Sequence, residues 1–417
     1  MKIAVIGAGI IGVTTAYELG RDGHEVTVFE RRGAAAEEGS FANAGIVAPG
    51  YVTPWAAPGM PGKVLRQLLR RHASARLGMP LSMAELAWAW KWYRACRLDV
   101  YQANRAQLQR LAFYSRTRLH AIRAHLSLNY DRSEGYMVLW RHERDRAIAQ
   151  PGLRVLRDAG VAFQLLDPTQ ARMVEPALNP DTAFAGAIQI AGDEVGNCRQ
   201  FAMMLKNESQ RAGVRFEFNT DVQCVENAGA IAVRVRGETT ARPFDAVVLC
   251  AGVGAAPLLK PLGLTIPIVA VYGYSLSAAI GEPLHAPRSA VMDEHYKVAI
   301  ARIGQRVRIA GSAELGGLPG KKRQAAIQTL YKVLHDWFPG AASRVNGVQE
   351  WKGARPMLPD RPPIIGPSGI AGLWLNLGHG SSGWALSCGS ARALADLVLG
   401  HQPEIDMQGF DLHRRAT

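Results

Sequence analysis

The stretch Met1-Lys-Ile-Ala-Val-Ile-Gly-Ala-Gly-Ile-Ile-Gly12, together with Val26-Thr-Val-Phe-Glu30, decides the fold. An apolar run over residues 3–6 predicts a strand, the spaced glycines predict a tight turn, and the residues up to Gly23 predict a helix. The second stretch predicts another buried strand, which ends on an acid. This order of strand, glycine turn, helix and strand is typical of a sheet that binds a dinucleotide.

Each glycine of this turn has its own physical task. Gly7 permits the turn, Gly9 lets a pyrophosphate approach the backbone, and Gly12 lets the helix pack on the strand. The start of the helix offers free N–H groups and a positive dipole end to phosphates. Glu30, 18 positions after Gly12, can accept hydrogen bonds from ribose hydroxyls. We therefore predict cofactor contacts by Gly7, Gly9, Ile10, Ile11, Gly12, Glu30 and Arg31, and a glycine turn that serves packing alone is the alternative.

Composition narrows the class of protein. The 417 residues are enough for about two to three domains with a large core. A hydrophobic share of 48% and a charged share of 20% are typical of a soluble globular protein, and no apolar run reaches the about 20 residues that span a bilayer. Five cysteines without CxxC or Cys/His metal spacing predict reduced thiols in a cytoplasmic protein and no metal site. A strand that starts at residue 2 predicts that no signal peptide is cleaved.

The chain is basic. It has 48 Lys and Arg against 35 Asp and Glu, which gives a formal net charge of +13. The basic residues cluster loosely over residues 66–76, 105–123 and 321–323, and no aromatic-interleaved RNA-binding motif accompanies them. We expect a solvated basic face and no nucleic-acid partner. Attraction to an anionic membrane surface is the second interpretation, and nucleic-acid binding is the third.

Residues 82–127 predict two long helices, because their apolar residues recur at helical spacing and Ala, Leu, Arg and Gln dominate. Trp88 and Trp92 share one helix face, and Trp90 does not. A core or interface stripe is the first interpretation, and a membrane-contact helix is the second. Residues 49–63, which are rich in Pro and Gly, predict an ordered loop.

The rest of the chain alternates between strands and helices. Helices are predicted over residues 143–159, 198–212 and 324–337, and strands over residues 136–140, 214–219, 221–226, 231–236 and 245–252. Strand-like runs dominate residues 266–309 and predict an antiparallel sheet. A strand over residues 373–377 runs into Gly378-His-Gly-Ser-Ser-Gly383 and a last helix up to Leu399.

The chain thus begins and ends with a strand, a glycine turn and a helix, and we expect both ends in one parallel sheet. The predicted fold class is α/β. A discontinuous Rossmann-like domain over residues 1–50, 190–255 and 345–417 is expected to bind the cofactor. An inserted substrate domain of α+β type, built on the antiparallel sheet, is expected over residues 51–189 and 256–344.

Three further segments carry candidate chemistry. Ser40-Phe-Ala-Asn-Ala-Gly45 offers backbone N–H groups and a hydroxyl to a phosphate or a ring, or it is an ordinary loop. The glycines over residues 378–383 suit a flat or anionic ligand. A flavin fits them, because a helix N-terminus stabilises the charge that develops at its N1–C2=O edge on reduction. Arg355 precedes Pro356, and a rigidly held guanidinium there suits bidentate capture of a carboxylate, with a structural ion pair as the alternative.

Taken together, these segments resemble the FAD-dependent D-amino-acid oxidase superfamily, and within it the small-subunit type of bacterial D-amino-acid dehydrogenase. The resemblance runs over nearly the whole chain. It is carried by the N-terminal glycine turn with Glu30, the loops over residues 40–45 and 49–59, Gly273-Tyr-Ser275, Tyr296-Lys-Val-Ala-Ile300, Gly353-Ala-Arg-Pro356 with Pro359-Asp360, and Gly378-His-Gly380.

The resemblance implies roles for particular residues. FAD would also contact Ser40, Ala42, Asn43, Ala44, Gly45, Val222, Ala251, Gly252, Gly378, His379, Gly380, Ser381, Gly383 and Trp384. Arg355 would bind the substrate carboxylate, and Tyr274, or else Tyr51 or Tyr296, would shape the pocket. Arg355 and Tyr274 are accordingly the candidate catalytic residues.

The implied reaction is oxidation of a D-amino acid by hydride transfer to flavin N5. The imino acid is hydrolysed to a 2-oxo acid and ammonia, or persists if it is cyclic, and a quinone-type acceptor takes the electrons. No protein base is required when the amine binds unprotonated. We expect a cytoplasmic enzyme, free or peripheral on the inner face of the plasma membrane, as a monomer or in a homo- or hetero-oligomer.

The sequence also departs from this family pattern near the expected substrate site. Ala354 stands where leucine is usual, Arg361 stands where a small residue often follows Pro-Asp, and the chain ends soon after the last helix. Alternatives are therefore a D-proline or D-hydroxyproline dehydrogenase and an O₂-using D-amino-acid or glycine oxidase. A FAD-binding subunit of a heteromeric complex and a flavin enzyme that acts on RNA are alternatives of other classes.

Overall fold

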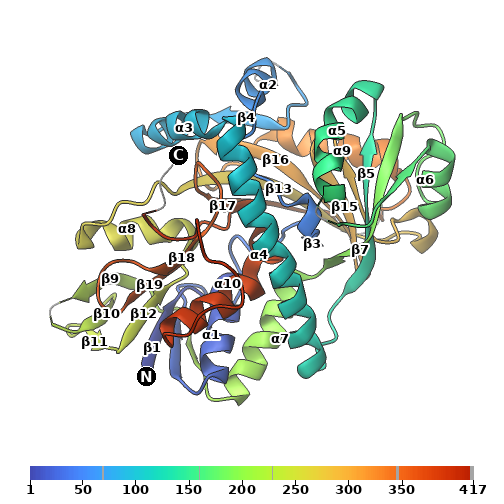
Figure 1. Ribbon diagram of the computed structural model, residues 1–417. Helices are drawn as coiled ribbons and strands as arrows, with labels where there is room; N and C mark the ends of the chain where they lie inside the picture. The colour runs from blue at the N-terminus through green and yellow to red at the C-terminus, as the bar shows by residue number, and fades with distance from the viewer. Residues whose placement is uncertain (68–69, 159, 228, 344–346, 414–417) are drawn as a thin grey trace.

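The computed structural model describes residues 1–67, 70–158, 160–227, 229–343 and 347–413, and two large sheets organise them (Figure 1). The smaller of the two has six strands in the order β18-β19-β12-β1-β2-β8. The larger has ten strands, eight of them in the order β17-β13-β16-β15-β14-β5-β7-β3, with β4 beside β16 and β6 beside β7. The predicted α/β class with a second sheet is confirmed.

The six-stranded sheet is the predicted dinucleotide-type sheet. Its first unit is β1 (Lys2–Ile6), α1 (Ile10–Arg21) and β2 (Glu25–Phe29). Both ends of the chain belong to it as predicted, because β12 (Ala246–Leu249) lies between β1 and the C-terminal strand β19 (Leu373–Leu377). The strands run parallel, except that β18 (Ile364–Pro367) is antiparallel to β19, and β8 (Arg215–Glu217) forms the other edge.

Both faces of this sheet are covered. Ile3 and Val5 face a core formed with α1, α7 (Cys198–Arg211), α10 (Gly383–Val398) and the long helix α4 (Leu98–His125). Ala4 and Ile6 face the opposite side, onto a three-stranded sheet and the short helix α8 (Ala255–Leu259). The three strands are β9 (Val222–Asn227), β10 (Ile231–Val235) and β11 (Arg242–Pro243). Strand residues that are buried on both sides explain the unbroken apolar runs in the sequence.

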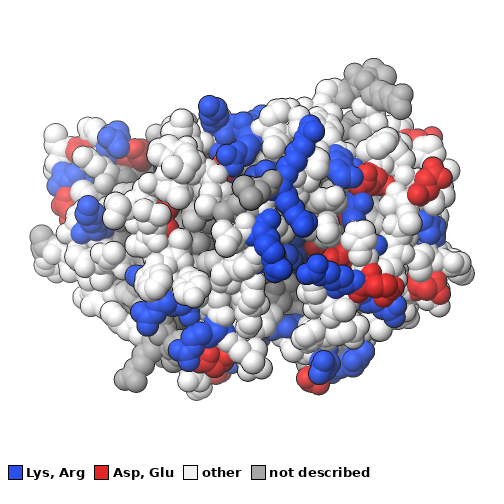
Figure 2. All heavy atoms as spheres, turned by 90° about the horizontal axis from the view of Figure 1, so that it is seen from above, with Lys and Arg blue, Asp and Glu red and all other residues white. Residues whose placement is uncertain are grey.

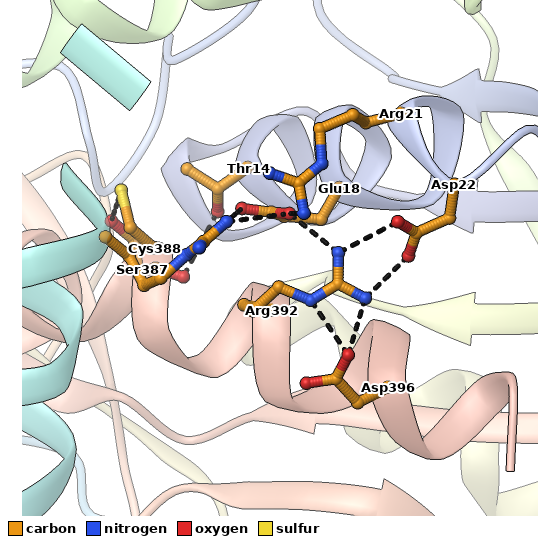
Figure 3. A network of polar contacts seen from close by, with 9 residues as sticks. Thr14, Glu18, Arg21, Asp22, Ser387, Cys388, Arg392 and Asp396 are labelled. Carbon is orange, nitrogen blue, oxygen red and sulfur yellow. Dashed lines mark hydrogen bonds and ion pairs between the residues drawn. The ribbon is translucent and has the colours of Figure 1, made fainter. Parts of the chain in front are cut away.

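A buried ion network joins the two ends of the chain (Figure 3). Glu18 of α1 has no exposed surface, and its carboxylate lies 2.8 Å from Nη1 of Arg392 on α10 and 3.1 Å from Nη2 of Arg118 on α4. Arg392 also pairs with Asp22 at 2.6 Å and Asp396 at 2.7 Å. The network fixes α10 against α1, and therefore one glycine turn against the other.

The ten-stranded sheet is mostly antiparallel, as predicted, and only the pairs β14–β5 and β16–β4 are parallel. Its strands are β3 (Ile46–Val47), β4 (Ala75–Gly78), β5 (Arg132–Trp140), β6 (Gln164–Leu166), β7 (Gly186–Gly196), β13 (Val269–Ala279), β14 (Ala290–Asp293), β15 (Val298–Ile303), β16 (Arg306–Gly316) and β17 (Gln349–Met357). Helix α9 (Gln324–Trp337) buries its apolar face on one side of the sheet. On the other side α5 (Glu143–Asp158) covers β5 and β7. The short helix α6 (Pro168–Val174) packs on the same side as α9, where Ala171 joins its core cluster.

The two helices predicted over residues 82–127 are α3 (Met83–Ala95), which a Ser82–Glu85 capping box starts, and α4. The core interpretation holds for Trp88 and Trp92. Trp88 is buried and donates from Nε1 to the carbonyl of Met357 at 2.9 Å, and Trp92 packs on the same cluster. Trp90 is 62% exposed and stacks on Tyr93.

Two segments differ in detail from their predictions. The predicted loop over residues 49–63 holds a 3₁₀ turn, η1 (Pro49–Tyr51), and the start of helix α2 (Met60–Gln67). The segment around Arg355, predicted as a rigid proline-bounded stretch, is the strand β17, which pairs with β13 at the edge of the larger sheet. The division into a cofactor domain and a substrate domain stays a prediction. That division assigns β17 to the cofactor domain, whereas the strand it pairs with, β13, falls in the predicted substrate domain.

Candidate active site

A large cavity of about 2120 Å³ lies between the two sheets. Its wall holds every predicted cofactor residue except Gly12, and it holds Arg355, Tyr51 and Tyr274 but not Tyr296. Lys63 and Arg66 of α2 and Arg144 and Arg154 of α5 also line it. Figure 2 shows Lys and Arg side chains gathered across the middle of the face seen from above. The cavity is therefore a basic cleft that suits anionic ligands.

The N-terminal turn has the predicted geometry. Gly7 has φ +101°, and its N–H donates to the carbonyl of Phe29 at 2.8 Å. A Cβ on Gly12 would overlap the carbonyl of Gly7, so only glycine lets α1 start this close to β1. Gly9 supplies no side-chain cap to α1, and Oγ of Ser40 accepts from the N–H of Ile10 at 3.0 Å. The loop over residues 40–45 thus sits on the start of α1.

Glu30 is held with its carboxylate at the cavity wall. One oxygen accepts from the N–H of Ala8 at 2.7 Å and the other from the N–H of Arg32 at 2.8 Å. These two backbone bonds fix the carboxylate where a ribose would lie against the turn. The side chain of Arg31 pairs instead with Glu38, at 2.7 Å, and that pairing raises the pKa of Arg31.

The loop over residues 40–45 contacts the start of α10, just after the C-terminal glycine turn. Nε1 of Trp384, at the start of α10, donates to the carbonyl of Gly45 at 3.2 Å. Gly45 has φ +78°, and its N–H donates to Oδ1 of Asn43 at 2.9 Å. The two halves of the predicted cofactor site therefore form one continuous surface.

The C-terminal turn holds its backbone in conformations that favour glycine, at the start of α10. Gly378 has φ +80° and Gly380 has φ +57°, and α10 begins without a side-chain cap from Ser382. His379 is 2% exposed and its Nε2 lies 3.0 Å from Oγ of Ser390. Burial, and then the cation of Arg361, lower the pKa of His379 to about 3, so this imidazole is neutral at physiological pH.

These observations test whether FAD fits the site. Helices α1 and α10 both begin at the wall of this cavity, and neither receives a capping hydrogen bond from the side chain of its N-cap residue. The free N–H groups at such a helix start bind anionic groups. Both turns depend on glycine, because a Cβ on Gly12 would overlap Gly7 and a Cβ on Gly380 would overlap Arg361, and residues of both turns line the cavity. The donor set fits FAD, of which α1, Glu30 and the loop over residues 40–45 would hold the adenosine side and α10 the flavin side.

Arg355 projects into this cavity from β17. Its Nη1 donates to the carbonyl of Ser312 at 2.7 Å, and its guanidinium lies 5.7 Å from the ring centre of Trp55. No carboxylate in the described ranges pairs with it, and its remaining N–H groups have no acceptor there. Burial lowers the pKa of Arg355 to about 10, so the group stays charged at neutral pH. A fixed guanidinium without a counter-ion suits an incoming carboxylate.

The strand β17 also brings Arg355 to the cofactor turns. Pro356 lies against Gly252, and Met357 forms an isolated bridge with His379. The carbonyl of Ala354 lies beside Gly39, next to the loop over residues 40–45. Arg355 is thus held between three segments predicted to contact the cofactor.

The three predicted tyrosines have different surroundings. Tyr51 lines the cavity, donates its hydroxyl to Glu294 and packs edge-on against Tyr136. Tyr274 borders the cavity, but its side chain lies in the core beneath α9, and its hydroxyl donates to Glu314. The register pairs Arg355 with Val271 and Tyr274 with Lys352, which places Tyr274 on the sheet face opposite to Arg355.

Tyr296 lies outside the cavity wall, packed against His72 and His295. The roles predicted for Tyr274 and Tyr296 stay predictions, and these contacts favour structural roles for both.

Sequence reasoning missed several wall residues. Trp351 and Arg355 lie on the same face of β17 with Gly353 between them, and a Cβ on Gly353 would overlap the indole of Trp351. Trp55 and the carbonyl of Ser312 complete this wall. The available signal lies in Trp351-Lys-Gly-Ala-Arg355. If this segment is taken as a strand, its side chains alternate between the two faces, and Trp351 and Arg355 fall on the same face.

The fold and the two facing glycine turns define the class, which is a flavin-dependent oxidoreductase. The family model for FAD dependent oxidoreductases matches residues 2–397, and the chain belongs to that family. FAD is therefore its cofactor.

Curated relatives match over the full length. One is a D-amino acid dehydrogenase of Cereibacter sphaeroides, 42% identical over 422 aligned positions, which cover 100% of this chain and 96% of the relative. Another is a D-amino acid dehydrogenase of Bradyrhizobium diazoefficiens, 41% identical over 421 positions, with 100% and 99% covered.

Solved structures share the fold at lower identity. Glycine oxidase from Geobacillus kaustophilus matches with a TM-score of 0.79 and 21% identity, covering 100% of this chain and 99% of that one. L-proline dehydrogenase from P. horikoshii matches with a TM-score of 0.73 and 16% identity, covering 99% and 96%. These likenesses show the fold alone. Among the described helices none is both long and apolar enough to cross a membrane.

Proposed function

We propose that this protein oxidises D-amino acids to imino acids, which water hydrolyses to 2-oxo acids and ammonia. The observation that carries the proposal is Arg355, a cation without a counter-ion, held between the cofactor turns in a basic cavity. The curated relatives named as D-amino acid dehydrogenases at 41–42% identity support the substrate class.

Binding and orientation are the tasks of the chain's own residues. Arg355 binds the substrate carboxylate, and the carbonyl of Ser312 fixes the plane of the guanidinium. Trp55 and Trp351 wall this end of the cavity and exclude water from the reacting carbon. FAD, when bound, supplies the acceptor for the hydride that leaves the α-carbon.

A neutral amine replaces a protein base in this scheme. Its lone pair forms the C=N bond as the C–H bond breaks, and the substrate loses two electrons and two protons overall. The wall residues therefore need only hold the amine unprotonated and the α-hydrogen toward the flavin, and such positioning supplies much of the rate.

The test is anaerobic loss of the oxidised flavin absorption band on mixing with a panel of D-amino, L-amino and cyclic imino acids. Rapid bleaching by D-amino acids is expected. Bleaching only by L-amino acids, or by none, would contradict the proposal. Bleaching by D-proline or glycine alone would move the substrate to those alternatives.

Arg355→Met should lower kcat/KM by about 30-fold or more, since losing one partner of a desolvated charge pair costs about 2–5 kcal/mol. Near-normal turnover of that variant at low substrate would remove Arg355 from the carboxylate site.

We further infer that a quinone-type acceptor takes the electrons and that the enzyme works on a membrane surface. On α3 the side chains of Met83, Leu86, Trp90 and Tyr93 follow helical spacing and are exposed, with Met83 81% exposed. Lys91 and Arg94 flank them. Exposed apolar and aromatic side chains beside cations suit an anionic bilayer.

Two measurements test this second inference. Turnover should reduce a quinone analogue faster than O₂, and rapid peroxide formation in air would favour an oxidase instead. Purified enzyme should co-sediment with vesicles of anionic lipid, and a Met83→Ser/Trp90→Ser double variant should lose this binding. A Met173→Ser/Leu284→Ser variant removes equally exposed side chains elsewhere and serves as its control. Equal binding by both variants would contradict the α3 surface.

A further inference from the structure

Arg361 lies under the turn over residues 378–382 in an unusual backbone conformation. Its φ is +96°, a region that residues with a side chain seldom adopt. Its side chain is nevertheless 2% exposed and lines the large cavity. Backbone strain of this kind persists where the surroundings hold the residue for a task.

The guanidinium of Arg361 is fastened to the turn. Nη2 donates to Oγ of Ser382 at 2.7 Å and to Oγ of Ser381 at 3.1 Å. Nη1 donates to the carbonyl of His379 at 3.3 Å, and Nε has no partner. A Cβ on Gly380 would overlap Nη1, so the turn passes directly over the cation.

This buried cation has no carboxylate within ion-pair distance in the part of the chain that the structure describes, whereas the equally buried Arg392 pairs with three. Burial, and then the neighbouring Arg355, lower the pKa of Arg361 to about 10, so it remains charged at neutral pH. His379 above it is neutral. Since buried charges are ordinarily paired, this cation is placed for negative charge that arrives from outside the chain.

We propose that Arg361 is a positioning residue that raises the reduction potential of the flavin, by holding the turn over residues 378–382 and by keeping a fixed positive charge beneath it. The inference rests on the proposed placement of the flavin at α10. Reduction adds two electrons and one proton to the ring and leaves one negative charge, which a nearby fixed cation stabilises. Its N–H groups face the turn, so Arg361 does not compete with Arg355 for substrate.

Three variants separate the charge from the hydrogen bonds. Arg361→Met removes both, Arg361→Gln keeps N–H donors without the charge, and Arg361→Lys keeps the charge without the planar donor set. The matched control is Arg172→Met on α6. Arg172 also holds a turn, donates to the carbonyls of Asn179, Pro180 and Thr182, has an unpartnered Nε and lies outside the cavity wall.

The readout is the flavin reduction potential, titrated anaerobically with dithionite against reference dyes. We expect the methionine and glutamine variants to shift by about 30 mV or more to negative values, a tenfold change in the two-electron equilibrium. The lysine variant and the Arg172 control should stay near the wild-type potential.

A wild-type potential in either neutral variant would overturn the inference. If both neutral variants lose FAD, the lysine variant decides the outcome. Its retention of FAD and of the wild-type potential would support the proposed role of the positive charge. Loss of FAD from all three would overturn it, because the arginine would then serve only the shape of the turn. Dithionite needs no substrate, so failure of the proposed D-amino acid reaction leaves this result readable.

Discussion

Gly273 of β13 lies directly beneath the guanidinium of Arg355, where a Cβ would overlap Nη2 and Cζ. The register places Gly273 opposite Gly353, so two glycines form the floor on which Arg355 and Trp351 rest. The position of Arg355, the proposed carboxylate-binding cation, therefore depends on the absence of a side chain on a neighbouring strand.

Gly273→Ala should displace the guanidinium and lower kcat/KM for a D-amino acid by about 10-fold to 100-fold, while the flavin stays bound. A shift of about 1 Å at a positioning group is enough for a loss of that size. Steady-state kinetics check this, with Gly320→Ala, where a Cβ meets nothing, as the control. Unchanged kinetics in the Gly273 variant would show that Arg355 can bind substrate from another position.

Glu30→Gln should weaken FAD binding by about tenfold or more. The carboxylate is held by the N–H groups of Ala8 and Arg32, and hydrogen bonds to a charged acceptor contribute about 1.5–3 kcal/mol. Titration of apoprotein with FAD, followed by quenching of flavin fluorescence, measures the Kd. Glu25→Gln at the exposed start of β2 is the control, and equal Kd values for both variants would refute the ribose assignment.

Asp193 should make the protein less stable as the pH rises from about 4 to 7. Its side chain is 1% exposed, and burial raises its pKa to about 7, although Arg116 lies 3.3 Å away. The folded pKa exceeds the unfolded value of about 3.9, so the folded state holds the proton more tightly in that window. The free energy of unfolding therefore falls by up to about 1.4 kcal/mol per pH unit there and levels off above pH 7.

Urea unfolding at several pH values checks this prediction. Asp193→Asn should flatten the curve between pH 4 and 7, because the amide does not titrate. Asp181→Asn, at an exposed position, should leave the curve unchanged. Parallel curves for wild type and Asp193→Asn would count against the raised pKa.

Arg392→Met should destabilise the fold by about 3 kcal/mol. The substitution takes one cation away from the fully buried Glu18 and leaves Asp22 and Asp396 unpaired (Figure 3), and breaking a buried pair costs about 3–5 kcal/mol. Chemical unfolding measures it. The control is Arg211→Met, which breaks an exposed pair with Glu208 and should cost under about 1 kcal/mol. A loss as small as that of the control would mean that Arg118 and Arg21, which both pair with Glu18, suffice to neutralise it.

The elements with strong local patterns were predicted well. Strand β1, helix α1 and strand β2 lie within a residue or two of their predicted bounds, because glycine spacing and apolar runs are local properties. The strand β17 was missed, because its proline and its alternating polar and apolar residues do not form an apolar run. The side of the sheet on which Tyr274 lies was also beyond the sequence, because strand neighbours set it.

The sequence by itself determined the class of this protein, since a glycine turn that accepts a dinucleotide needs particular residues at fixed short spacings. It also singled out Arg355, by residue type and by its proline neighbour. Only the tertiary structure decided what surrounds that arginine. Gly273, Ser312 and Trp55 reach it from three other segments. Tertiary structure likewise turned Arg361 from a departure in a motif into a buried charge under the C-terminal turn, because burial and partners arise only when distant segments pack together.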